Sequence, residues 1–358
     1  MSRSVRINSL QLLSMLLVSR FFTMLVAVPN RRYALSGSDA LLPPLFSALL
    51  MALLLLPLIF LMKRHPQQSL TQIAEVYLPK GKPLILLCLL LFCLLTAIAA
   101  ASQSEYFVST ALYPNAKRHW VLILFVLVVW YMVSMGIEAI SRVSLLVCGL
   151  IVLSFALIFT GVLSEVDWLN LGAPFRDSAE TLAMTTVAYW GQNMELVLLC
   201  ILQPYTRKSR FNRDSYLFLL GAFLLSEIIS FFTTVVLGSY GATRMFPVFT
   251  LAALSGHGFF SRLDYLHIIN WTFACLLRCA MYAAASVLLM RELLPKQSSA
   301  RLRAATMALI AIVCLFLTKG DGGTRWFYQF FASGIPILIA VVLLPLILLW
   351  KSRKKVKQ

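Results

Sequence analysis

The chain has 358 residues, of which 60% are hydrophobic and 13% are charged, and apolar runs of about twenty residues recur along it. A soluble globular domain does not have this composition, so the sequence predicts a membrane protein. The formal charge of +17 does not indicate nucleic-acid binding, because Lys and Arg lie between the apolar runs and in the C-terminal tail KSRKKVKQ. We expect these side chains to contact the headgroups of membrane lipid.

Counting about twenty apolar residues per crossing predicts ten transmembrane helices. We place them at residues 8–28, 41–62, 83–110, 119–135, 143–163, 181–203, 215–238, 264–290, 302–318 and 327–350. The first segment is expected to stay as a helix, because no small-residue cleavage site separates it from the second. Two short helices are expected in the connections: an amphipathic one in SLTQIAEVYL and an interfacial one within residues 240–262.

The 31 Lys and Arg residues divide unequally between the two sides of the membrane. Twenty fall on the side that holds both termini, nine fall on the other side, and Arg20 and Arg278 fall inside predicted spans. The connection GIEAISR, at residues 136–142, belongs to the more basic side. Because cytoplasmic segments retain positive charge, we expect both termini in the cytoplasm.

Ionisable residues inside the spans are the first candidates for function. Four lie near the centres of their spans and one lies nearer the outer end of the third span: Arg20, Glu195, Glu227 and Arg278, and then Glu105. A charge at the centre of a bilayer costs at least about 2.5 kcal/mol, so such residues face a protein interior or water. The four form either static Arg–Glu ion pairs or part of a site for a ligand or ion. Glu105 either lines a route inward or faces water.

A polar interruption in the sixth span is the second candidate. The stretch AYWGQNMELVLLC places Gly191, Gln192 and Asn193 beside Tyr189 in an otherwise apolar run. Glycine loosens a helix, and amides bind polar ligand groups without carrying charge. We interpret the stretch as a binding segment. The alternative is hydrogen bonding between helices, worth about 1 kcal/mol.

The sequence gives no sign of catalysis. It contains no nucleophile–base pattern, phosphate loop or cluster of metal ligands. The seven cysteines fall within predicted spans without CxxC spacing, which is typical of small packing residues. We therefore predict that the protein is not an enzyme and holds no metal or cofactor.

Four strings in the chain, in a fixed order, resemble one known family. They are SLTQIAEVYLPK, GIEAISRVS, MELVLLCILQPYTRK and TRMFPVFTLAALSGHGFFSRLDYLHIINW. The chain resembles the permease-like B subunits of spore germinant receptors, within the amino acid/polyamine/organocation superfamily. This resemblance implies an all-α, LeuT-like membrane domain of ten helices, with discontinuous first and sixth helices. The inverted repeats are expected at residues 8–163 and 181–350, followed by a basic cytoplasmic tail at 351–358.

The resemblance also implies a function. A small nutrient, often an amino acid, would bind between the first, third, sixth and eighth helices and trigger germination. The partners would be a receptor A subunit and a lipoprotein C subunit in the spore inner membrane. The residues expected to bind ligand are Ser19, Arg20, Thr23, Tyr189, Gly191, Gln192, Asn193 and Arg278. Those expected to form an intramembrane charge network or ion path are Glu105, Glu195 and Glu227.

The first span departs from the family pattern, because it has no glycine between Arg20 and Pro29. Either Arg20 takes over the binding of a ligand anion, or it blocks the site by pairing with Glu195 or Glu227. Two other functions therefore stay open beside nutrient sensing. The same fold and site would serve a secondary amino-acid transporter, and a blocked site would leave a structural partner for the other receptor subunits.

Overall fold

A computed structural model describes residues 7–25, 35–113, 115, 117–207, 210–256, 263–317, 330 and 333–356. This part of the chain is helical apart from its connections. Its extended pairing is an isolated parallel bridge, in which Ile7 N donates to Tyr205 O at 2.8 Å and Arg207 N donates to Ile7 O at 2.8 Å. The bridge fixes the start of the first helix against the chain that follows the sixth span.

The α-helices, in chain order, are α1 (Ser9–Leu25), α2 (Leu42–Leu54), α3 (Leu56–Arg64), α4 (Leu70–Tyr77), α5 (Lys82–Phe107), α6 (Arg118–Met135), α7 (Ile137–Gly161), α8 (Ala179–Gly191), α9 (Glu195–Leu202), α10 (Phe211–Thr243), α11 (Pro247–Leu254), α12 (Asp264–Leu293), α13 (Ser299–Leu317), α15 (Ile335–Ile337) and α16 (Leu344–Val356). Two π-helical turns extend them: η3 (Val108–Leu112) continues α5, and η7 (Leu338–Leu343) joins α15 to α16. Four 3₁₀ segments lie in the connections: η2 (Gly37–Leu41), η4 (Leu163–Glu165), η5 (Trp168–Leu171) and η6 (Gln203–Tyr205).

Each of the ten predicted spans overlaps helical structure, and eight helical segments of the described chain are long and apolar enough to cross a membrane. The two that fall short are the first and sixth spans, for which discontinuous helices were expected. The sixth is divided into α8 and α9. The first, α1, has 17 residues and no interruption, and residues 26–28 of its predicted span lie outside the described part. At 1.5 Å per residue α1 spans about 25 Å, less than the hydrocarbon thickness of about 30 Å.

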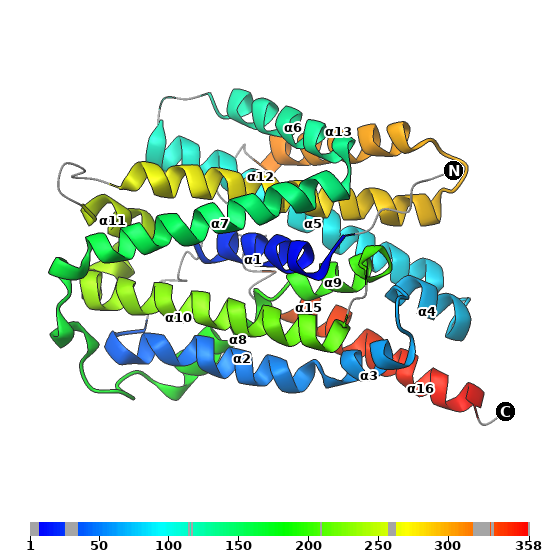
Figure 1. Cartoon of the computed structure of the whole chain (residues 1–358), viewed down its shortest axis with the longest axis horizontal. Helices are drawn as coiled ribbons and strands as arrows, with labels where there is room; N and C mark the ends of the chain where they lie inside the picture. Colours follow the sequence, from blue (N-terminus) through cyan, green and yellow to red (C-terminus); the bar gives the residue numbers. More distant parts are fainter. Residues whose placement is uncertain are drawn as a thin grey trace.

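The helices run side by side along one axis, with α1 in the middle of the bundle (Figure 1). It packs against α7, α10 and α12, and most of its side chains from Leu12 to Leu25 are buried. The outer helix α6 instead exposes Leu124, Leu127 and Tyr131. An apolar outer face suits hydrocarbon, whereas a central helix carries its polar side chains into the protein interior.

The predicted loop at residues 136–142 is wrong. Only Gly136 connects α6 to α7, and the rest of GIEAISR forms the first turns of α7. Gly136 has a φ of 88°, which glycine adopts without a steric penalty. Glu138 and Arg142, four residues apart, form an ion pair on the surface of this segment, which adds a small stabilisation to the helix.

The two expected short helices are present. Helix α4 begins with a capping box, in which the Ser69 hydroxyl accepts from Gln72 N and the Gln72 side chain accepts from Ser69 N. Its apolar residues Leu70, Ile73 and Ala74 are buried. Helix α11 lies within the predicted range of 240–262, of which residues 257–262 are outside the described part.

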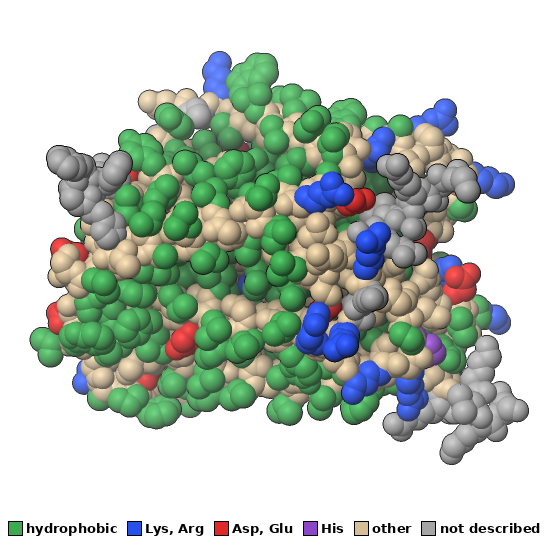
Figure 2. Space-filling model, viewed as in Figure 1, with side chains coloured by type: hydrophobic (Ala, Val, Ile, Leu, Met, Phe, Trp, Pro, Cys, Tyr) green, Lys and Arg blue, Asp and Glu red, His purple; other side chains and the backbone are tan. Residues whose placement is uncertain are grey.

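Charge is distributed unevenly along the bundle. Most of the Lys and Arg side chains visible in Figure 2 gather at the end that holds α4 and the end of α16. Helix α1 begins at this same end (Figure 1). Hydrophobic side chains cover the flank between the two ends (Figure 2).

Candidate functional site

The sixth span breaks where the sequence predicts it. Helix α8 ends at Gly191 and α9 begins at Glu195. Within the break, Asn193 N donates to Trp190 O at 3.1 Å, and the Asn193 amide Nδ2 donates to the same carbonyl at 3.1 Å. The side-chain amide thus adds a second donor to a carbonyl at the broken end of α8, which already accepts from the backbone. Asn193 therefore stabilises the break between α8 and α9.

A buried ion pair lies beside this break. Arg278 Nη1 of α12 is 2.5 Å from Glu195 Oε1, and the two side chains are 3% and 0% exposed. Arg278 Nη1 also donates to the backbone oxygen of Ser19 at 2.8 Å and to its hydroxyl oxygen at 2.7 Å. The Ser19 hydroxyl in turn donates to Glu195 Oε1 at 2.8 Å. This pair is one of the four Arg–Glu pairings that the sequence allows, and it joins α1, α9 and α12.

The surroundings of Arg278 are mostly apolar. Its guanidinium carbon lies 5.2 Å from the centre of the Tyr282 ring and 6.0 Å from that of Phe22. Arg278 Nη2 lies 3.5 Å from Met194 Sδ. Aromatic faces attract a cation, and low polarity strengthens the charge interaction with Glu195. These contacts hold the guanidinium in one position.

Arg20 is the residue after Ser19 on α1, and its side chain has a different partner from that of Arg278. Its Nη1 donates to Gln192 Oε1 in the α8–α9 break at 3.3 Å, and the Arg20 side chain is 2% exposed. Tyr189, one turn before the break, shares a hydrogen bond of 3.3 Å with Ser230 of α10. Arg20 and Gln192 therefore connect α1 to the broken span at a point separate from the Arg278 pair.

Glu227 lies on α10, near the group formed by Arg20, Gln192 and Tyr189. Both the Arg20 cation and the Glu227 carboxylate are close enough to Tyr189 to act on it electrostatically. Glu227 is half-buried, and its Oε2 is fully buried without a hydrogen bond. Within the described part of the chain its carboxylate forms no ion pair. Glu227 thus presents a buried carboxyl oxygen that no other described residue engages.

The remaining predicted residues have local roles. The Thr23 hydroxyl donates to Arg20 O at 2.6 Å within α1. Glu105 lies near the end of α5, where it forms an ion pair of 3.4 Å with Arg118 at the start of α6. The structure therefore brings the other predicted residues together around α1 and the break, and places Glu105 at the α5–α6 connection.

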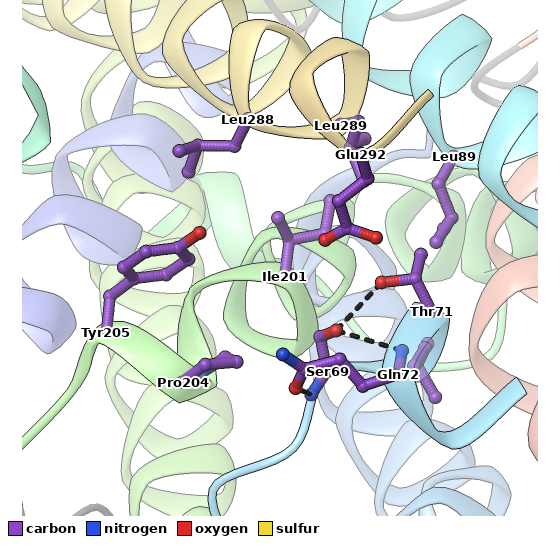
Figure 3. A pocket seen from close by; sticks show the side chains of 11 residues that line it. Ser69, Thr71, Gln72, Leu89, Ile201, Pro204, Tyr205, Leu288, Leu289 and Glu292 are labelled. Atoms are coloured by element: carbon purple, nitrogen blue, oxygen red, sulfur yellow. Dashed lines mark hydrogen bonds between the residues drawn. The ribbon is translucent and has the colours of Figure 1, made fainter. Parts of the chain in front are cut away.

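A small pocket lies at another place, between α4, α5, η6 and α12 (Figure 3). Its volume of about 20 Å³ holds only one or two water molecules. Polar groups of Ser69, Thr71 and Glu292 line one part of it, and Tyr205 closes another (Figure 3). Burial and the nearby Glu292 carboxylate raise the pKa of the Tyr205 phenol, which stays a neutral hydrogen-bond donor. None of the predicted site residues lines this pocket.

Comparison with known proteins assigns the family. Residues 6–321 match the family model described as "Spore germination protein", named for a spore permease. The chain belongs to the spore germination protein family. No curated protein matches the sequence.

Comparison with a solved structure indicates the fold class of this spore germination protein. It is similar to a Na⁺-coupled sialic acid symporter in a substrate-bound outward-open state, with a TM-score of 0.63 and 11% sequence identity. The match covers 96% of this chain and 90% of the symporter chain. The spore germination protein is therefore a permease-like membrane protein of the LeuT fold class, as its sequence predicts.

Sequence reasoning missed two residues that complete the site in this spore germination protein. Tyr282 follows Arg278 by four residues, and this helical spacing is a signal that was available. Ser230 of α10 gave no signal, because its partner Tyr189 is 41 residues away in the chain.

Proposed function

We propose that this spore germination protein is the membrane subunit of a germinant receptor, which binds a small nutrient and triggers germination. The nutrient is an amino acid, bound between α1, the α8–α9 break and α10. The observation that carries this proposal is that the buried Arg20 guanidinium and the Glu227 carboxylate both lie near Tyr189, and that Glu227 Oε2 has no hydrogen-bond partner among the described residues.

The chemistry of these two groups fits a zwitterion. A guanidinium binds a carboxylate through parallel hydrogen bonds, and a buried carboxylate attracts an ammonium group. Gln192 already orients Arg20 through its amide oxygen and lies where the helix is open. The Arg278–Glu195 pair neutralises itself, so it adds no net charge that would repel either end of the ligand.

Binding acts on the receptor by shifting a conformational balance. The ligand would contact α1, the broken span and α10, three elements that can change their packing relative to one another. A ligand shifts such a balance only by the difference between its affinities for the two states. The flexible point is the α8–α9 break, where three residues separate two helices.

The sharpest test is Glu227→Gln, which keeps the shape of the side chain and removes its charge. Losing a hydrogen bond to a charged group costs about 1.5–3 kcal/mol, so we expect the half-maximal amino-acid concentration to rise about 10- to 100-fold. The measurement is germination against amino-acid concentration, normalised to the amount of protein in the spore membrane. The matched control is Ile228→Leu, because Ile228 is the next residue and is 44% exposed. An unchanged dose dependence in Glu227→Gln would reject the site.

A secondary amino-acid transporter is the second candidate. The likeness in fold to a Na⁺-coupled symporter favours it. A transporter turns over, so purified protein in lipid vesicles would accumulate labelled amino acid inside, whereas a receptor would bind the amino acid without uptake. Binding with no uptake above protein-free vesicles supports the receptor, and sustained uptake supports the transporter.

The proposed receptor has an A subunit and a lipoprotein C subunit as partners and lies in the spore inner membrane with both termini in the cytoplasm. The basic end of the bundle supports this orientation, because cytoplasmic segments retain Lys and Arg (Figure 2). Purification of the chain from spore membranes, followed by identification of the proteins bound to it, tests the partners. Recovery of the chain without either subunit would contradict the receptor assignment.

A further inference from the structure

One nitrogen of Arg278 occupies a position surrounded by oxygen atoms. Nη1 lies 2.8 Å from the Ser19 backbone oxygen, 2.7 Å from the Ser19 hydroxyl and 2.5 Å from Glu195 Oε1. Two of these atoms come from α1 and the third comes from the first residue of α9, next to the break. A carbonyl, a hydroxyl and a carboxylate thus converge on a single cationic point between two spans.

Carbonyl and carboxylate oxygens are ligands that hard cations prefer in proteins. Backbone carbonyls and helix ends at interrupted spans coordinate the coupling Na⁺ near the middle of the membrane. In this protein the guanidinium already supplies the positive charge at these oxygens. A Na⁺ bound to them would lie within hydrogen-bond distance of Arg278, and two like charges repel strongly in a buried site. The residues present therefore do not fit a bound Na⁺.

We propose that Arg278 is a tethered cation that takes the place of a coupling Na⁺ in this protein. It closes α12 onto α1 and α9 by the charge interaction that a bound ion would otherwise supply. Conformational change and ligand response are therefore independent of Na⁺. Only the statement about ligand response rests on the proposed function; the replacement of the ion concerns the protein without ligand.

This proposal differs in a measurable way from a merely structural ion pair. Removing Arg278 leaves the Ser19 oxygens and the Glu195 carboxylate together in a buried space, which is an anionic oxygen site. Glu195 Oε2, which forms no hydrogen bond within the described residues, adds a further ligand. The variant Arg278→Ala should therefore gain a Na⁺ site that the natural chain lacks.

The experiment measures the thermal stability of the purified full chain, without amino acid, in NaCl and in choline chloride at equal ionic strength. The natural chain should melt at the same temperature in both salts. Arg278→Ala should melt about 3 °C or more higher in about 100 mM Na⁺, because an ion that binds only the folded state stabilises it. Arg278→Lys keeps a tethered cation and should show no Na⁺ effect. Arg278→Ala combined with Glu195→Gln removes the anionic ligand and should lose the gain.

Two results would overturn the proposal: Na⁺-dependent stabilisation of the natural chain, or equal melting of folded Arg278→Ala in both salts. If Arg278→Ala yields no folded protein, the natural chain and Arg278→Lys still decide the matter, because Na⁺ stabilisation of either one contradicts the proposal. Failure of the proposed function would appear differently. The chain would then bind no amino acid in either salt, while its melting temperature would still be independent of Na⁺.

Discussion

Neutralising one member of the Arg278–Glu195 pair should destabilise the protein more than neutralising both. Breaking a buried ion pair by removing one partner costs about 3–5 kcal/mol, because a charge stays buried without compensation. Arg278→Gln should lie at the upper end of this range, since among the described residues it leaves the Glu195 carboxylate with neutral donors such as the Ser19 hydroxyl and with no cation. Glu195→Gln should lie at the lower end, since Arg278 keeps two Ser19 oxygens at 2.8 and 2.7 Å.

The double variant should cost less than the sum of the two single variants by about 2 kcal/mol or more, because it buries polar groups without a net charge. The assay is the melting temperature of purified protein in choline chloride, together with the yield of folded protein from membranes. The matched control is the exposed pair Arg142 and Glu138, whose charged atoms are also 2.5 Å apart but whose side chains are 68% and 44% exposed. Neutralising that pair should change stability by less than about 0.5 kcal/mol. Additive effects at Arg278 and Glu195 would refute the reasoning.

Two further predictions concern topology and packing. An engineered cysteine at Asn115 should react with a membrane-impermeant probe from outside, and one at Ser298 only after permeabilisation, because we propose that the more basic side is cytoplasmic. Labelling of Ser298 in intact cells would reverse the orientation. Gly334→Ala should lower stability by about 2 kcal/mol or more, because Gly334 has a φ of +74° and a Cβ there would lie 2.5 Å from Cζ3 of Trp190. A melting temperature equal to that of the natural chain would contradict this.

Local sequence patterns were sufficient for most of the elements. The break after Gly191 followed from a glycine and two amides inside an apolar run, because only a protein interior satisfies such groups in a membrane. Helix α4 followed from the spacing of Leu70, Ile73 and Ala74. The loop at 136–142 was wrong because two charged residues suggested a connection, whereas Glu138 and Arg142 lie on one helical face.

The pairing of charges could not be predicted from local pattern. Arg278 is 83 residues from Glu195 and 259 residues from Ser19, and no periodicity relates these positions. The sequence therefore allowed four Arg–Glu pairings, and three-dimensional packing selected one. The pocket beside Tyr205 was missed for the same reason, because α4, η6 and α12 come from distant parts of the chain.

On the proposed function, the difference between the two Arg–Glu sets restricts the class of ligand that the site would bind. Arg278 and Glu195 neutralise each other directly, whereas no ion pair joins Arg20 to Glu227 within the described residues, although both lie near Tyr189. A purely anionic ligand would be attracted by Arg20 but repelled by the Glu227 carboxylate. A purely cationic ligand would be attracted by Glu227 but repelled by Arg20. Either one would add an uncompensated charge to a site of low polarity. A zwitterion adds none and satisfies both groups at once, so on the proposed function we expect the site to select ligands that are neutral overall but carry two opposite charges.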